Sequence, residues 1–211
     1  MARRKDHSRE ELKEMILSTA WDIIESGGVG RLTAREISKK IGYVPGTIYN
    51  IFPSMDVLHL HVNAMTLNLL AEKLEKAAQR SRGKSLEERL LGLARAYLAF
   101  AQMYRPFWMA LFSDDLSGLK ETQSWYGQAI EDVFQPLEGI LREDCPNKPG
   151  IREESHILWS SVHGITYLWA TGKLPPLAGK AGSKAPASEK KAEWEKMVSK
   201  LVGMFCSSNS S

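Results

Sequence analysis

Cysteine is scarce in this sequence, and its scarcity excludes two kinds of structure. The 211 residues include two cysteines, Cys145 and Cys206, which lie far apart and outside any CxxC spacing. A disulfide framework or a zinc site built on cysteine is therefore not expected. Glycine and proline, with 16 and 9 residues, are too sparse for a fibrous or disordered chain. The remaining composition, 43% hydrophobic, allows a globular protein with a substantial core.

Long apolar runs are also missing. No run approaches the roughly 20 residues that a membrane-spanning helix needs. The basic residues Arg3, Arg4 and Lys5 near the N-terminus are not followed by the apolar stretch of a signal peptide. We therefore expect a cytoplasmic protein that has no membrane partner.

Motifs for catalysis and metal binding are lacking as well. The sequence contains no GxSxG, no phosphate-binding glycine loop and no HExxH. His59 and His61 are two residues apart, which on a helix directs them to different faces. His156 and His163 share a helical face, but no cysteine or carboxylate has ligand spacing to them. We therefore expect no enzyme activity, no metal site and no cofactor; an enzyme built on a helical bundle would have to depend on His163.

Strand patterns are rare, whereas helical patterns are plentiful. We find no clear alternating run flanked by turn dipeptides, while apolar residues recur at 3.6-residue spacing over long stretches. The sequence therefore predicts an all-α fold. The net charge of +3 and the pI near 8.8 permit nucleic-acid binding without requiring it.

Residues 32–58, LTAREISKKIGYVPGTIYNIFPSMDVL, predict two short helices joined by a tight turn. Thr33 can cap the first helix as the start of a capping box. Gly42 suits the left-handed residue that ends this helix, and Pro45 suits the first position of the next one. Pro53 then stops the second helix. Two short helices with a glycine turn are typical of a helix-turn-helix, whose second helix enters the DNA major groove.

The residues on the second short helix favour a DNA-binding role over a purely structural role in an all-α protein. Helices joined by a glycine turn also occur in all-α proteins that never bind DNA. However, Gly46 allows a close backbone approach, and Thr47, Tyr49 and Asn50 offer polar groups suited to phosphates and base edges. A helix stabilised mainly by its own core would more often carry alanine, leucine or lysine at these positions.

The segment from about residue 8 to residue 60 resembles the N-terminal DNA-binding domain of the TetR family of transcriptional regulators. The resemblance rests on the helix that begins at Thr33, the glycine turn, the GTIY sequence of residues 46–49, and the break of residues 52–54. It implies three helices, the last two of which form the helix-turn-helix.

The family resemblance also implies roles for individual residues. The sequence departs from the family pattern where Val44, Ile51 and Met55 replace more usual polar or basic residues. Val44 in particular removes a side-chain cap worth about 1 kcal/mol. The expected DNA contacts are Pro45, Gly46, Thr47 and Asn50 nearest the bases, with Thr33, Tyr43, Thr47 and Tyr49 holding phosphates.

Helical patterns continue through the rest of the chain. We expect a DNA-binding domain over residues 1–53 and a second helical domain over 54–211, with a loop at about 175–187 that is rich in Gly, Ala, Pro and Lys. The expected helices open at Ser8, at Ser54 (to about Arg80), at Ser85 and at Pro106, and then cover 120–142 (kinked at Pro136), 153–171 and 188–205.

The C-terminal region resembles TetR-family effector domains that carry a Trp…His-Gly motif, here Trp159, His163 and Gly164. In such domains the last two long helices pack against their two-fold mates, so the resemblance implies a homodimer through helices 153–171 and 188–205. An apolar stripe on a terminal helix supports this independently, because one small domain offers few places to bury it. The alternative is that both helices complete the monomer core.

Aromatic residues are concentrated in the second domain. One interpretation is that they form the core of a helical bundle. The other is that several of them line a pocket for an apolar or aromatic ligand, which His163 and a tyrosine hydroxyl would orient. The resemblance favours a pocket. The residues expected to bind the ligand are Met103, Tyr104, Trp108, Phe112, Trp125, Trp159, His163 and Tyr167.

These observations predict a homodimeric repressor that binds a near-palindromic DNA operator and is released by a small apolar or aromatic ligand. The alternative is a DNA-associated dimeric interaction protein without a small-molecule switch. The sequence does not identify the ligand, the operator, the regulated genes, activation versus repression, or the number of dimers per operator.

Overall fold

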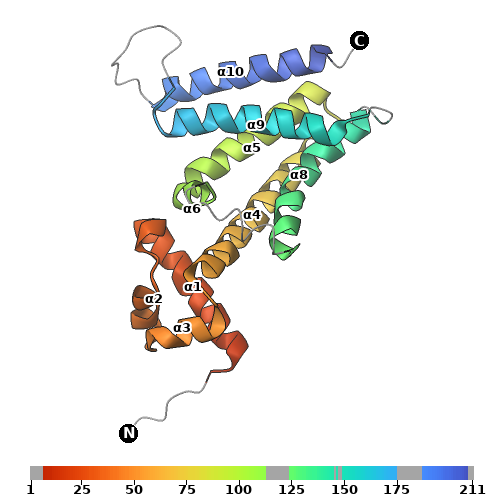
Figure 1. Ribbon diagram of the computed structural model, residues 1–211. Helices are drawn as coiled ribbons and strands as arrows, with labels where there is room; N and C mark the ends of the chain where they lie inside the picture. The colour runs from red at the N-terminus through yellow and green to blue at the C-terminus, as the bar shows by residue number, and fades with distance from the viewer. Residues whose placement is uncertain (1–6, 113–123, 145, 147–148, 175–186, 209–211) are drawn as a thin grey trace. The chain divides into compact units, whose positions relative to one another are not determined.

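The computed structural model describes residues 7–112, 124–144, 146, 149–174 and 187–208 (Figure 1). Within these ranges every regular element is helical, which confirms the predicted all-α fold. The elements are α1 (Arg9–Gly27), the 3-10 turn η1 (Val29–Arg31), α2 (Ala34–Ile41), α3 (Pro45–Ile51), α4 (Met55–Arg80), α5 (Leu86–Met103), α6 (Arg105–Ala110), α8 (Ser124–Asp144), α9 (Ile151–Ala170) and α10 (Ala187–Ser208).

Capping by a serine side chain sets the starts of three helices, α1, α4 and α5. Ser8 and Glu11 form a reciprocal capping box at α1, with Ser8 N–H donating to the Glu11 carboxylate over 2.7 Å. Ser85 and Glu88 bond in the same reciprocal way before α5. Ser54 accepts a hydrogen bond from the Val57 N–H as α4 begins. These starts agree with the sequence-based expectation.

Some expected features fall outside the described residues. The predicted loop at 175–187 lies there except for Ala187, which begins α10. The predicted start of a helix at residue 120 lies there too, and α8 is described from Ser124 to Asp144 with Pro136 inside it.

The chain divides into two compact units: residues 1–69 with 104–130, and residues 70–103 with 131–211. The division therefore lies within α4, after Leu69, whereas the sequence suggested a boundary between residues 53 and 54. The difference arises because residues well beyond 53 contribute to the core of the first unit.

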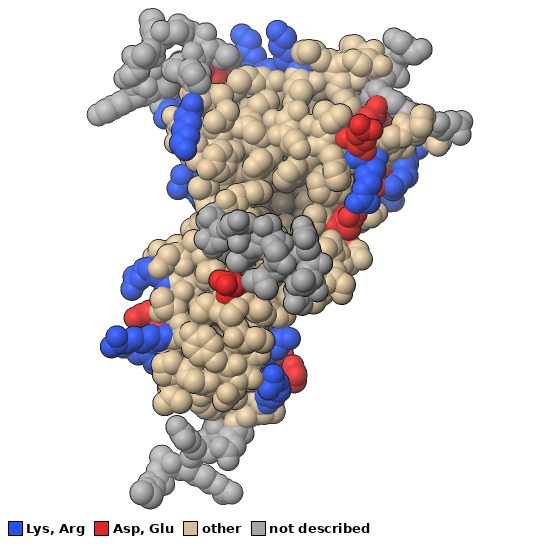
Figure 2. Space-filling view, in the orientation of Figure 1, with Lys and Arg blue, Asp and Glu red and all other residues tan. Residues whose placement is uncertain are grey.

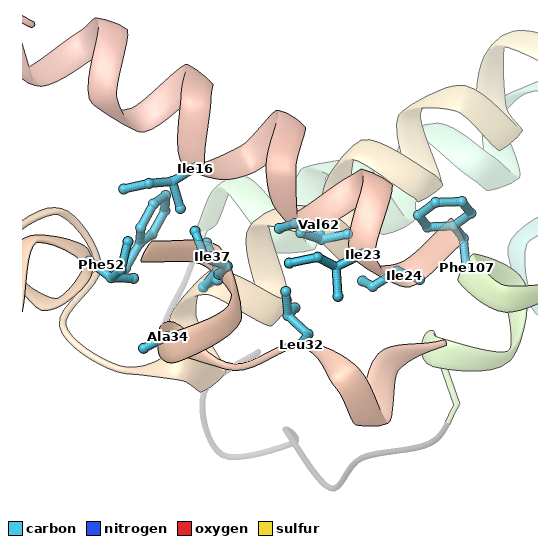
Figure 3. Close-up of a cluster of buried hydrophobic side chains, with 12 residues drawn as sticks. Ile16, Ile23, Ile24, Leu32, Ala34, Ile37, Phe52, Val62 and Phe107 are labelled. Carbon is cyan, nitrogen blue, oxygen red and sulfur yellow. The ribbon is translucent and has the colours of Figure 1, made fainter. Parts of the chain in front are cut away.

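The core of the first unit joins the helix-turn-helix to residues from α4 and α6 (Figure 3). Phe107 of α6 stacks on Trp21 of α1 with ring centroids 3.8 Å apart. Burial of each large apolar side chain contributes roughly 1.5–3 kcal/mol, so these added residues are a substantial part of the stability of the unit. The buried cluster comprises Ile16, Ala20, Ile23, Ile24, Leu32, Ala34, Ile37, Ile48, Phe52, Leu58, Val62 and Phe107.

The second unit is built on α5, α9 and α10, which pack against one another, with the C-terminal part of α4 and most of α8. Trp194 of α10 is fully buried, and its indole N–H donates to the Thr166 hydroxyl of α9 over 3.0 Å. Arg89 of α5 is buried and pairs with Glu143 and Asp144 at the end of α8. These contacts tie together helices that are distant in sequence.

No helix in the described part of the chain is both long enough and apolar enough to cross a membrane.

Candidate functional site

Three residues set the start of α2 and the turn between α2 and α3. The Thr33 hydroxyl accepts from the Glu36 N–H and caps α2. Gly42 ends α2 in the left-handed conformation, with φ 76° and ψ 28°. Pro45 occupies the first turn of α3, while Val44 provides no side-chain cap, as its aliphatic side chain predicts. Two short helices are thus joined by a sharp reversal of the chain.

Replacing Gly42 with alanine should lower the free energy of unfolding by about 1–2 kcal/mol, because an L-residue pays that amount in the left-handed region. Chemical denaturation of the purified protein measures the change. Gly46→Ala is the matched control: Gly46 does not have a positive φ, and an added Cβ there meets no atom within 4 Å. If both variants lost equal stability, the turn would not depend on the backbone of Gly42.

Helix α3 is fixed by one buried side chain and exposes most of the rest. Ile48 is 1% exposed and belongs to the core of the first unit. Tyr49, its neighbour, is 50% exposed, and Val44 at the helix start is 60% exposed. A helix held from one side by the core leaves its other side free to meet a ligand as large as a DNA duplex.

The seven residues expected to contact DNA lie in α3, in the turn before it or at the cap of α2, and none is buried. Tyr43 is held by a 2.6 Å hydrogen bond between its hydroxyl and His7 Nδ1. The exposed residues of the set are Thr33, Pro45, Gly46, Tyr49 and Asn50; the half-buried ones are Tyr43 and Thr47.

The structure adds residues that the sequence reasoning did not select. Arg35, Lys39 and Lys40 are exposed on α2, where their positive charge suits a phosphate backbone. The basic residues of this helix are visible in the sequence, so these three positions could have been predicted from it. His7, in contrast, lies 36 residues from its partner Tyr43, so no local pattern could have indicated it. Figure 2 shows Lys and Arg at both margins of the part that α1, α2 and α3 build.

The second unit contains an apolar cavity of about 40 Å³. Sites for drug-sized ligands usually measure about 300–1,000 Å³, so a ligand must widen this cavity to enter. Leu74 brings α4 to the cavity, and Trp159 brings α9. The lining residues are Leu74, Leu90, Leu93, Ala94, Tyr97, Val133, Leu137, Leu158, Trp159, Val162 and Val202.

The structure distributes the eight residues expected to bind a ligand over both units. Trp159 lines the cavity, and His163 and Tyr167 follow it on α9. Met103 is 73% exposed, at the end of α5. The others belong to the first unit: Trp108 is fully buried and contacts Phe112 edge-on, Trp125 stacks on His61, and Tyr104 packs against the core of that unit.

A hydrogen bond orients the polar groups next to the cavity. The Tyr97 hydroxyl lies 2.6 Å from His163 Nδ1, and the imidazole stacks on the Trp159 indole with centroids 5.0 Å apart and planes at 5°. Burial lowers the pKa of His163, so its imidazole is neutral at neutral pH. His163 is thus half-buried and bonded to Tyr97, a partner that the sequence pattern did not indicate.

Two family models match the sequence. Residues 16–62 match the model described as "Bacterial regulatory proteins, tetR family", and residues 90–185 match "Tetracyclin repressor-like, C-terminal domain". Together they cover about two thirds of the chain. The first contains the helix-turn-helix, and the second contains the cavity residues Tyr97 and Trp159.

Solved structures share the fold at low sequence identity. A protein of unknown function from Rhodococcus sp. RHA1 has TM-score 0.67 and 18% identity, covering 95% of this chain and 98% of its own. The TetR family transcriptional regulator PfmR from Thermus thermophilus has TM-score 0.56 and 15% identity, with coverage of 88% and 97%. A TetR transcriptional regulator from Rhodococcus sp. RHA1 has TM-score 0.56 and 11% identity, with coverage of 93% and 97%. No curated protein matches the sequence.

Proposed function

The chain belongs to the TetR family of transcription regulators, and from this membership we propose that it is a homodimeric repressor released from its operator by a small apolar or aromatic ligand. The proposal implies a role in binding rather than in catalysis. It also implies that the protein is located in the compartment that holds the chromosome, which in bacteria is the cytoplasm.

The observation that carries the proposal is the placement of α3. Ile48 holds the helix on the core, while Tyr49 and Asn50 face solvent. In this proposal Pro45, Gly46, Thr47 and Asn50 lie nearest the bases, while Thr33, Tyr43, Thr47 and Tyr49 hold phosphates.

Exposed apolar residues on α9 and α10 support a homodimer. On α9, Ile157 and Leu168 are 58% and 40% exposed, and the small residues Ser161 and Gly164 lie between them at helical spacing. Met204 of α10 is 61% exposed. A stripe of large apolar residues around small ones suits close packing of a helix against its two-fold copy, since an isologous interface pairs one patch with itself.

The proposed switch uses the continuity of α4. Leu74 of this helix lines the cavity, and Leu58 and Val62 of the same helix belong to the core that holds α3. A ligand that widens the cavity by moving Leu74 would alter the spacing of the two α3 helices in the dimer. The change in operator affinity cannot exceed the difference in ligand affinity between the two arrangements.

Selection from random duplex DNA tests the repressor proposal. The purified protein should enrich an inverted repeat whose half-sites are separated by one helical turn, about 34–36 Å, or a multiple of it. A scrambled repeat of equal composition serves as the competitor at the same salt concentration. Recovery of no common sequence, or of a single unrepeated half-site, would contradict a two-fold DNA-binding protein.

The small volume of the cavity favours a second candidate, a DNA-associated dimeric interaction protein without a ligand switch. At about 40 Å³ the cavity holds only a few water molecules in this conformation. Under this candidate no apolar compound would change the melting temperature or the operator affinity. Under the repressor proposal at least one would change both.

A further inference from the structure

Three tryptophans on α9 and α10 differ in the hydrogen bonding of their indole N–H groups. Trp169 donates to the Lys190 carbonyl over 2.9 Å, and Trp194 donates to the Thr166 hydroxyl over 3.0 Å. Trp159 Nε1 is buried and has no hydrogen-bond partner among the residues that the structure describes. Leaving a buried donor unpaired is unfavourable, so this donor gains from any acceptor that reaches it.

The unpaired donor belongs to Trp159, one of the residues that line the apolar cavity. The position of the indole is constrained by its neighbours. It stacks in parallel on His163 and meets the Tyr97 ring edge-on, with centroids 6.2 Å apart. A ring held in this way presents its N–H in a defined direction, which favours selectivity over simple partitioning of apolar compounds.

The rest of the lining limits the charge of an occupant. Among the described lining residues, Tyr97 and Trp159 carry the polar side-chain atoms, and the remaining nine are aliphatic. The Tyr97 hydroxyl is already bonded to His163. Burial lowers the pKa of His163, so this imidazole supplies no cation beside the cavity at neutral pH. A charged occupant would lose its hydration without gaining a counter-ion, which is strongly unfavourable.

We propose that this cavity takes a neutral, apolar molecule with a single hydrogen-bond acceptor, such as a ketone or ester carbonyl, which accepts from Trp159 Nε1. The inference rests on the proposed ligand-responsive function and specifies the chemistry of the ligand. The occupant reaches the indole as it widens the cavity, since about 40 Å³ is too small for a benzene ring.

Three probes of similar size separate the parts of this inference: acetophenone, which has one neutral acceptor; cumene, which is nearly isosteric and has none; and benzoate, which is charged. Calorimetric titration of wild type and Trp159→Phe gives the affinities. We expect the variant to bind acetophenone about tenfold more weakly and cumene equally well, and benzoate not to bind at concentrations that saturate with acetophenone. The infrared carbonyl stretch of acetophenone on the wild-type protein should move to lower wavenumber, as it does when a donor bonds to the carbonyl.

Trp169→Phe is the matched control, because it makes the same change on α9 at an indole whose N–H is already bonded outside the cavity. It should leave all affinities unchanged. If Trp159→Phe lost the same factor in affinity for acetophenone and for cumene, or if the carbonyl stretch did not shift, the proposed hydrogen bond from Trp159 would be wrong. If benzoate bound as tightly as acetophenone, the proposal that the ligand is neutral would be wrong. If none of the three compounds bound, the whole inference would be wrong. Selection of an operator by the wild-type protein would still support the repressor function in each case.

Discussion

Replacing Tyr49 with alanine is expected to lower operator affinity about a hundredfold. The side chain is half exposed on α3, and we propose that it packs on and bonds to a phosphate. Loss of the ring and hydroxyl costs about 1.4 kcal/mol per subunit, and a two-fold operator loses the contact twice. Gel-shift titration at one fixed salt concentration, on the operator found by selection, measures the change.

Tyr49→Phe separates the ring from the hydroxyl and should lower the affinity by only about tenfold, half of the free-energy loss expected for alanine. Both variants should keep the wild-type free energy of unfolding to within about 0.5 kcal/mol, because the side chain is not part of the core. Wild-type affinity in the alanine variant would remove Tyr49 from the DNA-binding surface.

Replacing Leu168 with arginine is expected to convert the dimer into a monomer and to weaken operator binding by a factor of about a hundred or more. In a two-fold interface the new charge meets its own copy, and both lose hydration. A monomer then binds one half-site alone. It loses the high effective concentration with which the second subunit of a dimer meets the second half-site. Light scattering on a sizing column should give a mass near the chain mass of 23.7 kDa in place of twice that value.

The control is Glu87→Arg, an added arginine at an exposed position of α5 that should leave the mass and the operator affinity unchanged. A Leu168→Arg protein that stays dimeric would show that the two copies associate elsewhere. A monomeric variant with wild-type operator affinity would show that dimerisation does not contribute to DNA binding.

The parts of the fold that could be predicted from the sequence depend on residues close together in the chain. The capping pairs Ser8 with Glu11 and Ser85 with Glu88, and the left-handed Gly42, act within one helical turn. Because such signals need no knowledge of the tertiary structure, they placed helix starts and the helix-turn-helix correctly.

The parts that could not be predicted depend on contacts between distant residues. Helical spacing shows which face of a helix is apolar but not what covers it. The sequence therefore grouped Trp108 and Trp159 in one candidate pocket, whereas the structure assigns them to different compact units. The bond between Tyr97 and His163 spans 66 residues, and the missing partner of the Trp159 N–H can be recognised only once its surroundings are known.

Phe107 has a consequence for protein engineering. Since this residue, with Leu58 and Val62, completes the packing around the helix-turn-helix, a chimaera that exchanges only the first 53 residues would leave an apolar surface uncovered on the graft. A DNA-binding unit that is to be transferred to another protein must include its own α6 segment, or the apolar surface that α6 covers must be redesigned. The same constraint bears on natural recombination, because a crossover just after the recognition helix would separate side chains that have to be inherited together.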